Sequence, residues 1–224
     1  MLSAIYYRVI RPLITQRSEH NDYSGGLWPR LVREKAGAML CGSRGRIVEL
    51  GCGEGLFLAL LVRHNPDADI FGIDTRPEIL EQARNRLGAT ARITLLTDDA
   101  LRTTIEPQTF DVCFCINTVL NLTDINAVRL LCAEAHRILK PGGVFIFDTR
   151  NALNPLISLQ YRFVRWYDPG ITVPVTAYRA GLIERVLREH GFTVRTQGHA
   201  GFPKGMFAPA IIFEAEKTAQ TQKS

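Results

Sequence analysis

The feature that most constrains this chain is the alternation of short apolar runs with amphipathic stretches between residues 46 and 148. The runs are rich in β-branched residues and carry little polar alternation, which is typical of parallel strands covered on both faces. The stretches between them repeat their apolar residues with a helical period. The pattern predicts an α/β fold with an open, doubly wound, mostly parallel sheet, in which right-handed crossovers bring the strand-to-helix loops to one end. The predicted strands are RIVEL (46–50), DIFGID (69–74), RITLL (92–96), FDVCFCI (110–116) and GVFIFD (143–148).

Composition adds a few exclusions. With 46% hydrophobic and 22% charged residues over 224 positions, the chain is typical of one soluble domain or of a domain with an appended cap, and a disordered protein is excluded. The longest apolar runs, LFLALLV and VFIF, are too short to span a membrane, and the N-terminus lacks the pattern of a secretory signal. The five cysteines form no C-x-x-C pair, which favours buried thiols in the cytoplasm and no metal site.

We expect three parts. Residues 1–45 are predicted to form a helical N-terminal arm or lid, with breaks at residues 24–26 and at Trp28-Pro29. Residues 46–216 are predicted to form the main domain, and its segment 150–176 is predicted to be a cap. Residues 217–224 are predicted to be a flexible tail.

Net charge is divided along the chain rather than spread evenly. Residues 1–46 carry 8 basic and 3 acidic side chains, residues 47–149 carry 9 and 14, and residues 150–224 carry 10 and 5. An acidic centre of −5 therefore lies between two basic flanks of +5 each. A uniformly basic nucleic-acid-binding protein would have a different distribution, so the excess charge points to an anionic small molecule or a membrane surface.

A glycine-rich turn, ELGCGEG (49–55), follows the first predicted strand, and a helix begins directly after it. Such a turn lets a ligand approach the backbone and presents free amide N–H groups. Its G-x-G-x-G spacing differs from the G-x-G-x-x-G of dinucleotide-binding turns. The carboxylate of Glu54 would repel a pyrophosphate but would tolerate an ammonium or a sulfonium group. We therefore expect a ligand that carries a positive charge.

Acidic side chains end the next two strands. Asp74, twenty-three residues after Gly51, is placed to accept hydrogen bonds from both ribose hydroxyls of an adenosine. In the segment 98–100, a carboxylate could accept the exocyclic adenine N–H and a backbone amide could reach a ring nitrogen. Three successive strand ends thus offer polar groups to three parts of one nucleoside ligand.

At these residues the chain resembles the class I S-adenosylmethionine-dependent methyltransferases, and within them the small-molecule enzymes of quinone-biosynthesis type. ELGCGEG is similar to the family's glycine motif, GID to its ribose acid, DDA to its adenine segment, FDVCFC to its fourth strand and LKPGG to the loop before its fifth. The similarity covers residues 44–148 in order and spacing. It implies a seven-stranded sheet with one antiparallel strand and S-adenosylmethionine as the cofactor.

The resemblance also implies where the cofactor's methionine end lies. Glu49 would lie near the ammonium, Gly51 and Gly53 would pass beneath the methionine, and a backbone carbonyl around Asn117 would accept from the ammonium. Many relatives have a histidine a few residues further on, where this chain has Asn121, which becomes a candidate substrate-binding residue.

At the adenosine end, the resemblance assigns the ribose to Asp74 and the adenine to Asp99 with the amide of Ala100. Asp98 is expected to be a solvated neighbour. Taken alone, each of these aspartates has an alternative role, because an aspartate at a strand end often only caps the following helix and binds no ligand.

The acceptor side is less defined. The catalytic base, if the reaction needs one, is unassigned, and the candidates are His20, Tyr23 and His199. Segment 150–176 mixes arginines with aromatic residues that could grip an acidic or aromatic acceptor. Equally, its aromatic rings could pack on the sheet while its arginines face water. The candidate residues of the segment are Arg150, Arg162, Arg165, Trp166 and Tyr167.

The primary hypothesis is methyl transfer by in-line displacement to an oxygen, nitrogen or carbon of a small molecule, which could be anionic, aromatic or lipid-like. One alternative is a catalytically silent S-adenosylmethionine-binding regulatory or scaffold protein. Lesser alternatives are an RNA methyltransferase and a NAD-linked dehydrogenase. Nucleic acid is disfavoured because no RNA-binding module is present. The basic N-terminal arm could contact a membrane surface, and the oligomeric state is not indicated.

Overall fold

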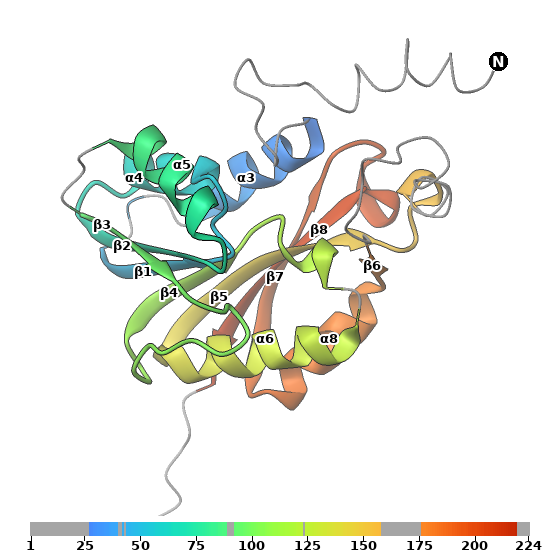
Figure 1. Cartoon of the computed structure of the whole chain (residues 1–224). Coiled ribbons are helices and arrows are strands. Elements are labelled where there is room, and N and C mark those ends of the chain that lie inside the picture. The colour runs from blue at the N-terminus through green and yellow to red at the C-terminus, as the bar shows by residue number, and fades with distance from the viewer. Residues whose placement is uncertain are drawn as a thin grey trace, which may run out of the picture.

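The strand and helix alternation expected from the sequence is present from β1 to β5 (Figure 1). The computed structural model describes residues 27–39, 42, 44–88, 92–122, 124–157 and 176–218. Its first elements are α3 (Leu27–Met39), β1 (Gly45–Leu50), α4 (Leu56–His64), β2 (Ala68–Asp74), α5 (Pro77–Leu87), β3 (Ile93–Thr97), β4 (Phe110–Cys115), the short helix η2 (Val119–Asn121), α6 (Ile125–Ile138) and β5 (Leu139–Asn151). They are followed by β6 (Ala177–Tyr178), α8 (Ala180–Glu189), β7 (Phe192–Ala200), η3 (Gly205–Phe207) and β8 (Ala210–Lys217).

The strands form one sheet in the order β3-β2-β1-β4-β5-β8-β7. Strands β1 to β5 pair in parallel, and β8 runs antiparallel to both β5 and β7. This confirms the predicted mostly parallel sheet with one antiparallel strand. The described residues add an eighth strand, the two-residue β6 beside the end of β5, where seven strands were expected.

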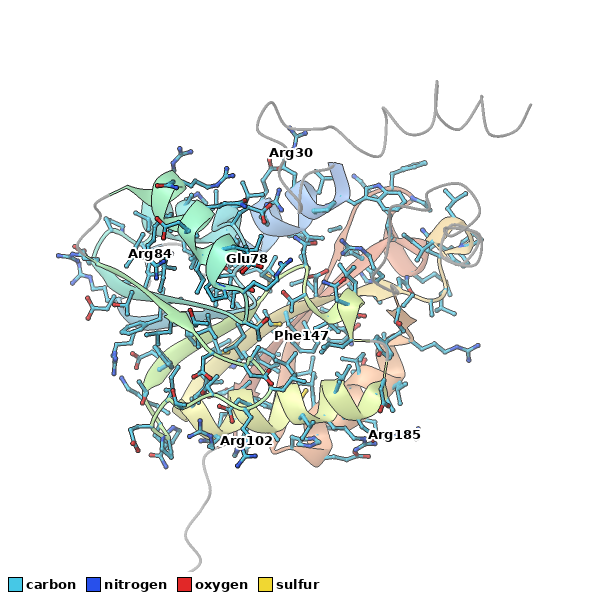
Figure 2. The ribbon with its side chains drawn as sticks, in the orientation of Figure 1. Arg30, Glu78, Arg84, Arg102, Phe147 and Arg185 are labelled. Atoms are coloured by element: carbon cyan, nitrogen blue, oxygen red, sulfur yellow. The ribbon has the colours of Figure 1, made fainter. Side chains whose placement is uncertain are left out.

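Two hydrophobic layers hold the sheet between helices. Helices α3, α4 and α5 cover one face, whereas α6 and α8 cover the other (Figure 1). Consecutive strand residues alternate between the layers, so Cys113 and Cys115 both face α6 and are fully buried, as predicted. Phe147, also fully buried, lies in the interior in Figure 2, where Arg102 and Arg185 lie near the lower edge of the molecule.

The switch between the two halves of the sheet lies between β1 and β4. From β1 the chain proceeds to β2 and β3 on one side, and then returns to β4 on the other. In sheets of this kind ligands bind at the carboxyl ends of the strands beside such a switch. The loops after β1, β2 and β4 are therefore the place to examine for a site.

Two predicted boundaries are wrong at the ends of the chain. Trp28-Pro29 does not break α3 but lies in its first turn. Backbone N–H groups in a first turn have no intrahelical acceptor, so the N–H that proline lacks costs the helix no hydrogen bond. Lys217, expected in a flexible tail, is the last residue of β8 and is 8% exposed. Its ammonium group is held by the carbonyl oxygens of His136 and Leu139, each 2.7 Å away.

Two other differences concern the strands near the predicted cap. Strand β5 continues to Asn151, so Arg150 belongs to the sheet rather than to a cap segment. The sequence favours a strand over FTVRTQ (192–197), with His199 after its end, but His199 is the penultimate residue of β7 and is paired with Ile211. Both strands are longer than predicted because antiparallel pairing with β8 extends them.

Candidate functional site

The carboxyl ends of β1, β2 and β4 surround a pocket of about 110 Å³. Among the residues lining it are five of the seven predicted cofactor residues and the predicted substrate residue Asn121. The fold thus brings together positions that are up to 72 residues apart in sequence. The five cofactor residues are Glu49, Gly51, Gly53, Asp74 and Asn117.

The glycine turn has a backbone that only glycine adopts easily. Gly51, Gly53 and Gly55 have φ angles of 76°, 52° and 77°. At Gly51 a Cβ atom would come within 2.6 Å of the Thr118 side chain, whose hydroxyl donates a hydrogen bond to the Gly51 carbonyl at 3.1 Å. The first glycine therefore allows the turn after β1 to contact the loop after β4.

Asp74 connects the glycine turn with the loop after β2. Its Oδ2 accepts a hydrogen bond from the Gly53 N–H at 3.0 Å, and its Oδ1 accepts one from the Arg76 N–H at 3.1 Å. The side chain of Arg76 also approaches Oδ1, with Nε at 3.5 Å. Each carboxylate oxygen retains further lone pairs for a ligand that enters the pocket.

Glu49 is the unusual group of this pocket. The residue is 2% exposed, and its Oε2 is the only buried side-chain nitrogen or oxygen of the described residues that has no hydrogen-bond partner. Burial raises the pKa of Glu49 well above its usual value, and the neighbouring Arg33 partly opposes that rise. A buried acceptor without a donor is destabilising unless a ligand supplies the donor. The site therefore fits a ligand with a cationic donor such as an ammonium group.

Arg33 is a functional candidate that the sequence reasoning missed. It lies on α3, lines the same pocket and faces Glu49 closely enough to lower the pKa of that residue. Its guanidinium suits a carboxylate. The basic content of the N-terminal flank was noted, but the sequence contained no signal that α3 would bring one particular arginine to β1.

Asn117 is held at the other side of the pocket by buried charged residues. Its backbone is in the left-handed region, with φ of 56°, and its N–H donates to Asp148 Oδ1 at 2.5 Å. Its side-chain oxygen accepts from Arg150 at 3.0 Å, and its side-chain nitrogen donates to the Pro29 carbonyl at 3.1 Å. Asn117 thus links the loop after β4 to β5 and to the first turn of α3.

Asp148 and Arg150 form the buried ion pair behind this loop. They are 1% and 3% exposed, and Asp148 Oδ2 lies 2.7 Å from Arg150 Nη1. Burial raises the pKa of Asp148, and Arg150 and the Asn117 N–H oppose the rise. Arg150 is thereby engaged inside the protein, whereas the sequence reasoning made it a candidate for contact with the acceptor.

The predicted adenine segment lies next to this pocket but not among its lining residues. The N–H of Asp98 donates to the Asp74 carbonyl at 3.1 Å, which keeps the segment beside the end of β2. Asp98 holds the turn through Thr104, whose N–H and hydroxyl donate to it at 2.7 and 2.8 Å. Asp99 is exposed and accepts from the Leu101 N–H at 2.9 Å, and Ala100 is half-buried. Their role toward adenine stays a prediction.

The candidate bases and cap residues are placed only in part. His199 is half-buried in β7, where its carbonyl accepts a hydrogen bond from Lys35 at 2.8 Å, and it is not among the residues lining the pocket. The other candidates lie outside the described residues, and their roles stay predictions. These are His20, Tyr23, Arg162, Arg165, Trp166 and Tyr167.

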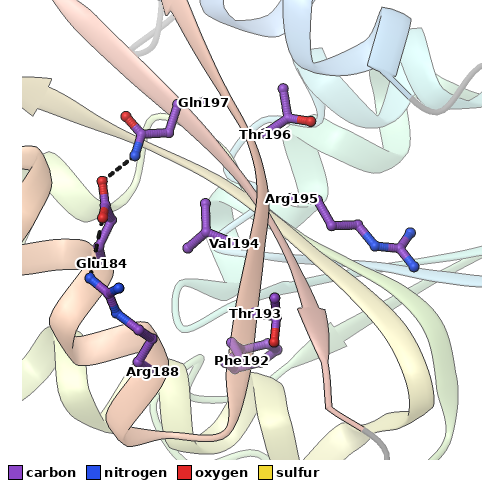
Figure 3. Close-up of a pocket in the computed structure, with 8 residues that line it drawn as sticks. All are labelled: Glu184, Arg188, Phe192, Thr193, Val194, Arg195, Thr196 and Gln197. Atoms are coloured by element: carbon purple, nitrogen blue, oxygen red, sulfur yellow. Dashed lines mark hydrogen bonds and ion pairs between the residues drawn. The ribbon is translucent and has the colours of Figure 1, made fainter.

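A second, larger hollow of about 460 Å³ lies at the edge of the sheet (Figure 3). It is lined by α8 and β7, and Glu184 there contacts both Arg188 and Gln197. Strand β7 is four positions from β1 in the sheet order. This hollow contains none of the predicted site residues, so size alone does not identify the functional pocket.

Comparison with known proteins agrees with the geometry. Residues 47–143 match a family model described as a methyltransferase domain. The chain is 30% identical over 141 residues to a ubiquinone/menaquinone biosynthesis C-methyltransferase of Desulfotalea psychrophila, covering 61% of this chain and 54% of that protein. It is 36% identical over 97 residues to a trans-aconitate 2-methyltransferase of Methylobacterium radiotolerans, covering 43% and 35%. The chain thus spans about half or less of the length of these relatives.

A solved structure shows the same fold. An S-adenosylmethionine-dependent methyltransferase from Mesorhizobium loti superposes with a TM-score of 0.65 at 22% identity, over 82% of this chain and 96% of that one. The matched residues 47–143 contain the glycine turn, Asp74 and Asn117, which line the pocket. Through these residues the chain is similar to S-adenosylmethionine-dependent methyltransferases, and its residues 47–143 match the methyltransferase domain.

Proposed function

We propose that this protein transfers a methyl group from S-adenosylmethionine to a small-molecule acceptor. The observation that carries the proposal is the buried Glu49 Oε2, which has no hydrogen-bond partner in a pocket that also contains Asp74 and Asn117. When bound, the cofactor supplies a methyl group activated by its sulfonium. The tasks of the chain are to bind the cofactor, to orient the acceptor and to exclude water.

Three of the pocket residues have tasks that follow from their chemistry. Glu49 would accept a hydrogen bond from the methionine ammonium, which gives its buried carboxylate a donor. Arg33 would pair with the methionine carboxylate. Asp74 would accept from the ribose hydroxyls while it keeps its hydrogen bond from the Gly53 N–H. The ammonium and the carboxylate of the ligand's methionine end would thus each face a protein group of the opposite charge.

For the acceptor we propose a small anionic molecule. The flanks of the acidic centre are basic, and Asn121 offers a neutral polar side chain at the pocket. The name of one relative, trans-aconitate 2-methyltransferase, indicates a small polyanion as its acceptor. Arg162, Arg165, Trp166 and Tyr167 remain the predicted residues for binding such an acceptor.

The test uses the purified chain with methyl-labelled S-adenosylmethionine and a metabolite extract of its host, fractionated by charge. Labelled product in the anionic small-molecule fraction is the expected result. A matched control is Asp74→Ala, which should lower the yield at limiting cofactor concentration. Saturable cofactor binding without labelled product would favour a silent binding protein. Label in RNA would favour an RNA methyltransferase, and binding of NADH alone would overturn the proposal.

A further inference from the structure

Five large apolar side chains are exposed together at the carboxyl end of the sheet. They belong to the segment after β5 and to the loop between β7 and β8, which lie beside one another in Figure 1. We call these residues the apolar tip. They are Leu153, Leu156, Phe202, Met206 and Phe207, with exposures of 41%, 56%, 82%, 62% and 46%.

Two buried asparagines fix the backbone beneath the apolar tip. Asn151 and Asn154 are both 0% exposed. The side-chain nitrogen of Asn151 donates to the carbonyls of Met206 and Ala208 at 2.8 and 2.9 Å, and that of Asn154 donates to the carbonyl of Phe207 at 2.6 Å. Polar groups in the interior thus hold the loop in place while its large side chains face outward. The side chains of the apolar tip are therefore exposed on a backbone that hydrogen bonds hold in place, and not on a frayed chain end.

Exposed apolar groups that are concentrated and held in this way mark a contact surface. The composition of the two segments indicates which kind. Residues 151–157 and 199–209 contain no carboxylate side chain, and exposed Lys204 lies between Phe202 and Met206. Aromatic, leucine and methionine side chains next to a cation match the interfacial region of an anionic bilayer, with acyl chains below and phosphates at the surface.

A protein partner fits the same features less well. A stable protein interface buries about 800 Å² on each partner over 20 to 30 residues. The apolar tip has only five large side chains from two short segments, of which Phe202 is the most exposed. So small a group of exposed apolar side chains is better suited to shallow insertion among lipid headgroups than to a stable protein interface.

We infer that the apolar tip docks this protein on an anionic lipid surface. The loop between β7 and β8 begins after Ala200 and ends before Ala210, which pairs with Arg150 near the end of β5. The tip is therefore at the same end of the sheet as the pocket formed after β1, β2 and β4. Docking would turn this end of the sheet toward the membrane. The inference goes beyond methyl transfer and does not depend on it.

The test is flotation of the full chain, without cofactor, with vesicles of phosphatidylcholine alone and with vesicles that also contain phosphatidylglycerol. We expect binding that is stronger to the anionic vesicles. The double variant Phe202→Ser/Met206→Ser should bind both kinds about tenfold more weakly or worse, because it loses two inserted apolar side chains. Lys204→Glu should weaken binding to the anionic vesicles only.

The matched control is Leu130→Ser, which removes a 55% exposed leucine from α6 and should bind as the unchanged protein does. Far-ultraviolet circular dichroism checks that every variant is folded. Absence of vesicle binding by the unchanged protein would overturn the inference. So would unaltered binding by the double variant, which would assign binding to another segment. A dimer that the double variant dissociates would also overturn it, by making the tip an interface between copies.

Discussion

Asp148 Oδ2 and Arg150 Nη1 lie 2.7 Å apart in the interior, and the two residues together hold the loop that forms one wall of the pocket at the ends of β1, β2 and β4. Asp148 accepts the N–H of Asn117, and Arg150 donates to its side-chain oxygen at 3.0 Å. Asn117 keeps a left-handed φ of 56° between them. An unfavourable backbone conformation of this kind persists only where its surroundings enforce it. The ion pair therefore acts on the pocket through Asn117, without lining it.

Replacing Arg150 by methionine should lower the free energy of unfolding by about 3–5 kcal/mol, because Asp148 would remain buried without its cation. Urea unfolding followed by circular dichroism measures the change. Arg195→Met is the control, since its ion pair with Glu216 is half-exposed and should contribute less than about 1 kcal/mol. Equal losses for the two variants would contradict the importance we give to the buried pair.

Replacing Asp74 by alanine should weaken S-adenosylmethionine binding by about 1–3 kcal/mol through the loss of the ribose hydrogen bonds. The variant also removes the acceptor of the Gly53 N–H, so part of the loss will come from a looser glycine turn. Calorimetric titration gives the dissociation constant. Glu81→Ala on α5, which removes an exposed carboxylate, is the control. An unchanged dissociation constant for Asp74→Ala would remove the ribose assignment.

Those parts of the fold that depend on local pattern could be predicted from the sequence. The apolar runs located β1 to β5, and the alternation of residues along β4 placed Cys113 and Cys115 on one buried face. Gly51 and Asp74 could be placed at one edge of the sheet because each follows or ends a strand whose place in the sheet follows from the βαβ rule, whereas Glu49 was assigned through the family resemblance. The spacing of such residues along the sequence is what allows their place in the sheet to be predicted.

Contacts between distant segments could not be predicted. Nothing near Asn117 indicates that it will bond to Pro29, 88 residues away. Arg150 reads as a cationic candidate for the acceptor. Its ion-pair partner Asp148 is only two residues away, but the sequence does not show that both are buried and that Arg150 bonds to Asn117 of the loop after β4. Lys217 reads as part of a polar tail until the carbonyls at the end of α6 provide acceptors for it. In each case a contact or a degree of burial that arises only on folding determines the role of the side chain.

Replacing Glu134 by glutamine should destabilise the protein at neutral pH by about 1–3 kcal/mol, because the carboxylate accepts hydrogen bonds from Thr103 and Arg137. Burial tends to raise the pKa of Glu134, but these bonds bring it below its usual value. Stability from such a group is present above the unfolded-state pKa and is lost as the pH falls through the folded-state pKa. Urea unfolding of both proteins should therefore show a difference that shrinks in acid. A difference that stayed constant with pH would exclude a role for the charge.

Replacing Glu49 by glutamine should have opposite effects on stability and on ligand binding. Burial raises the pKa of Glu49 in the folded protein, so the unliganded protein loses stability as the pH rises from the usual value of 4.5 through the raised pKa. Glutamine carries no charge to bury, and Glu49→Gln should be the more stable protein at neutral pH. Its advantage should vanish in acid, where Glu49 itself is protonated. Urea unfolding without cofactor, repeated across pH, measures this.

The same variant should bind S-adenosylmethionine about 10- to 100-fold more weakly at neutral pH, because a neutral amide replaces the carboxylate that faces the ammonium. S-adenosylhomocysteine, which keeps the amino-acid group and lacks the sulfonium, should lose affinity to the same extent, whereas adenosine, which lacks the amino-acid group, should not. A loss for all three ligands would mean that the substitution distorts the glycine turn. Greater stability together with undiminished cofactor affinity would show that Glu49 does not bind the methionine ammonium. The unpartnered Glu49 Oε2 would then have no assigned ligand.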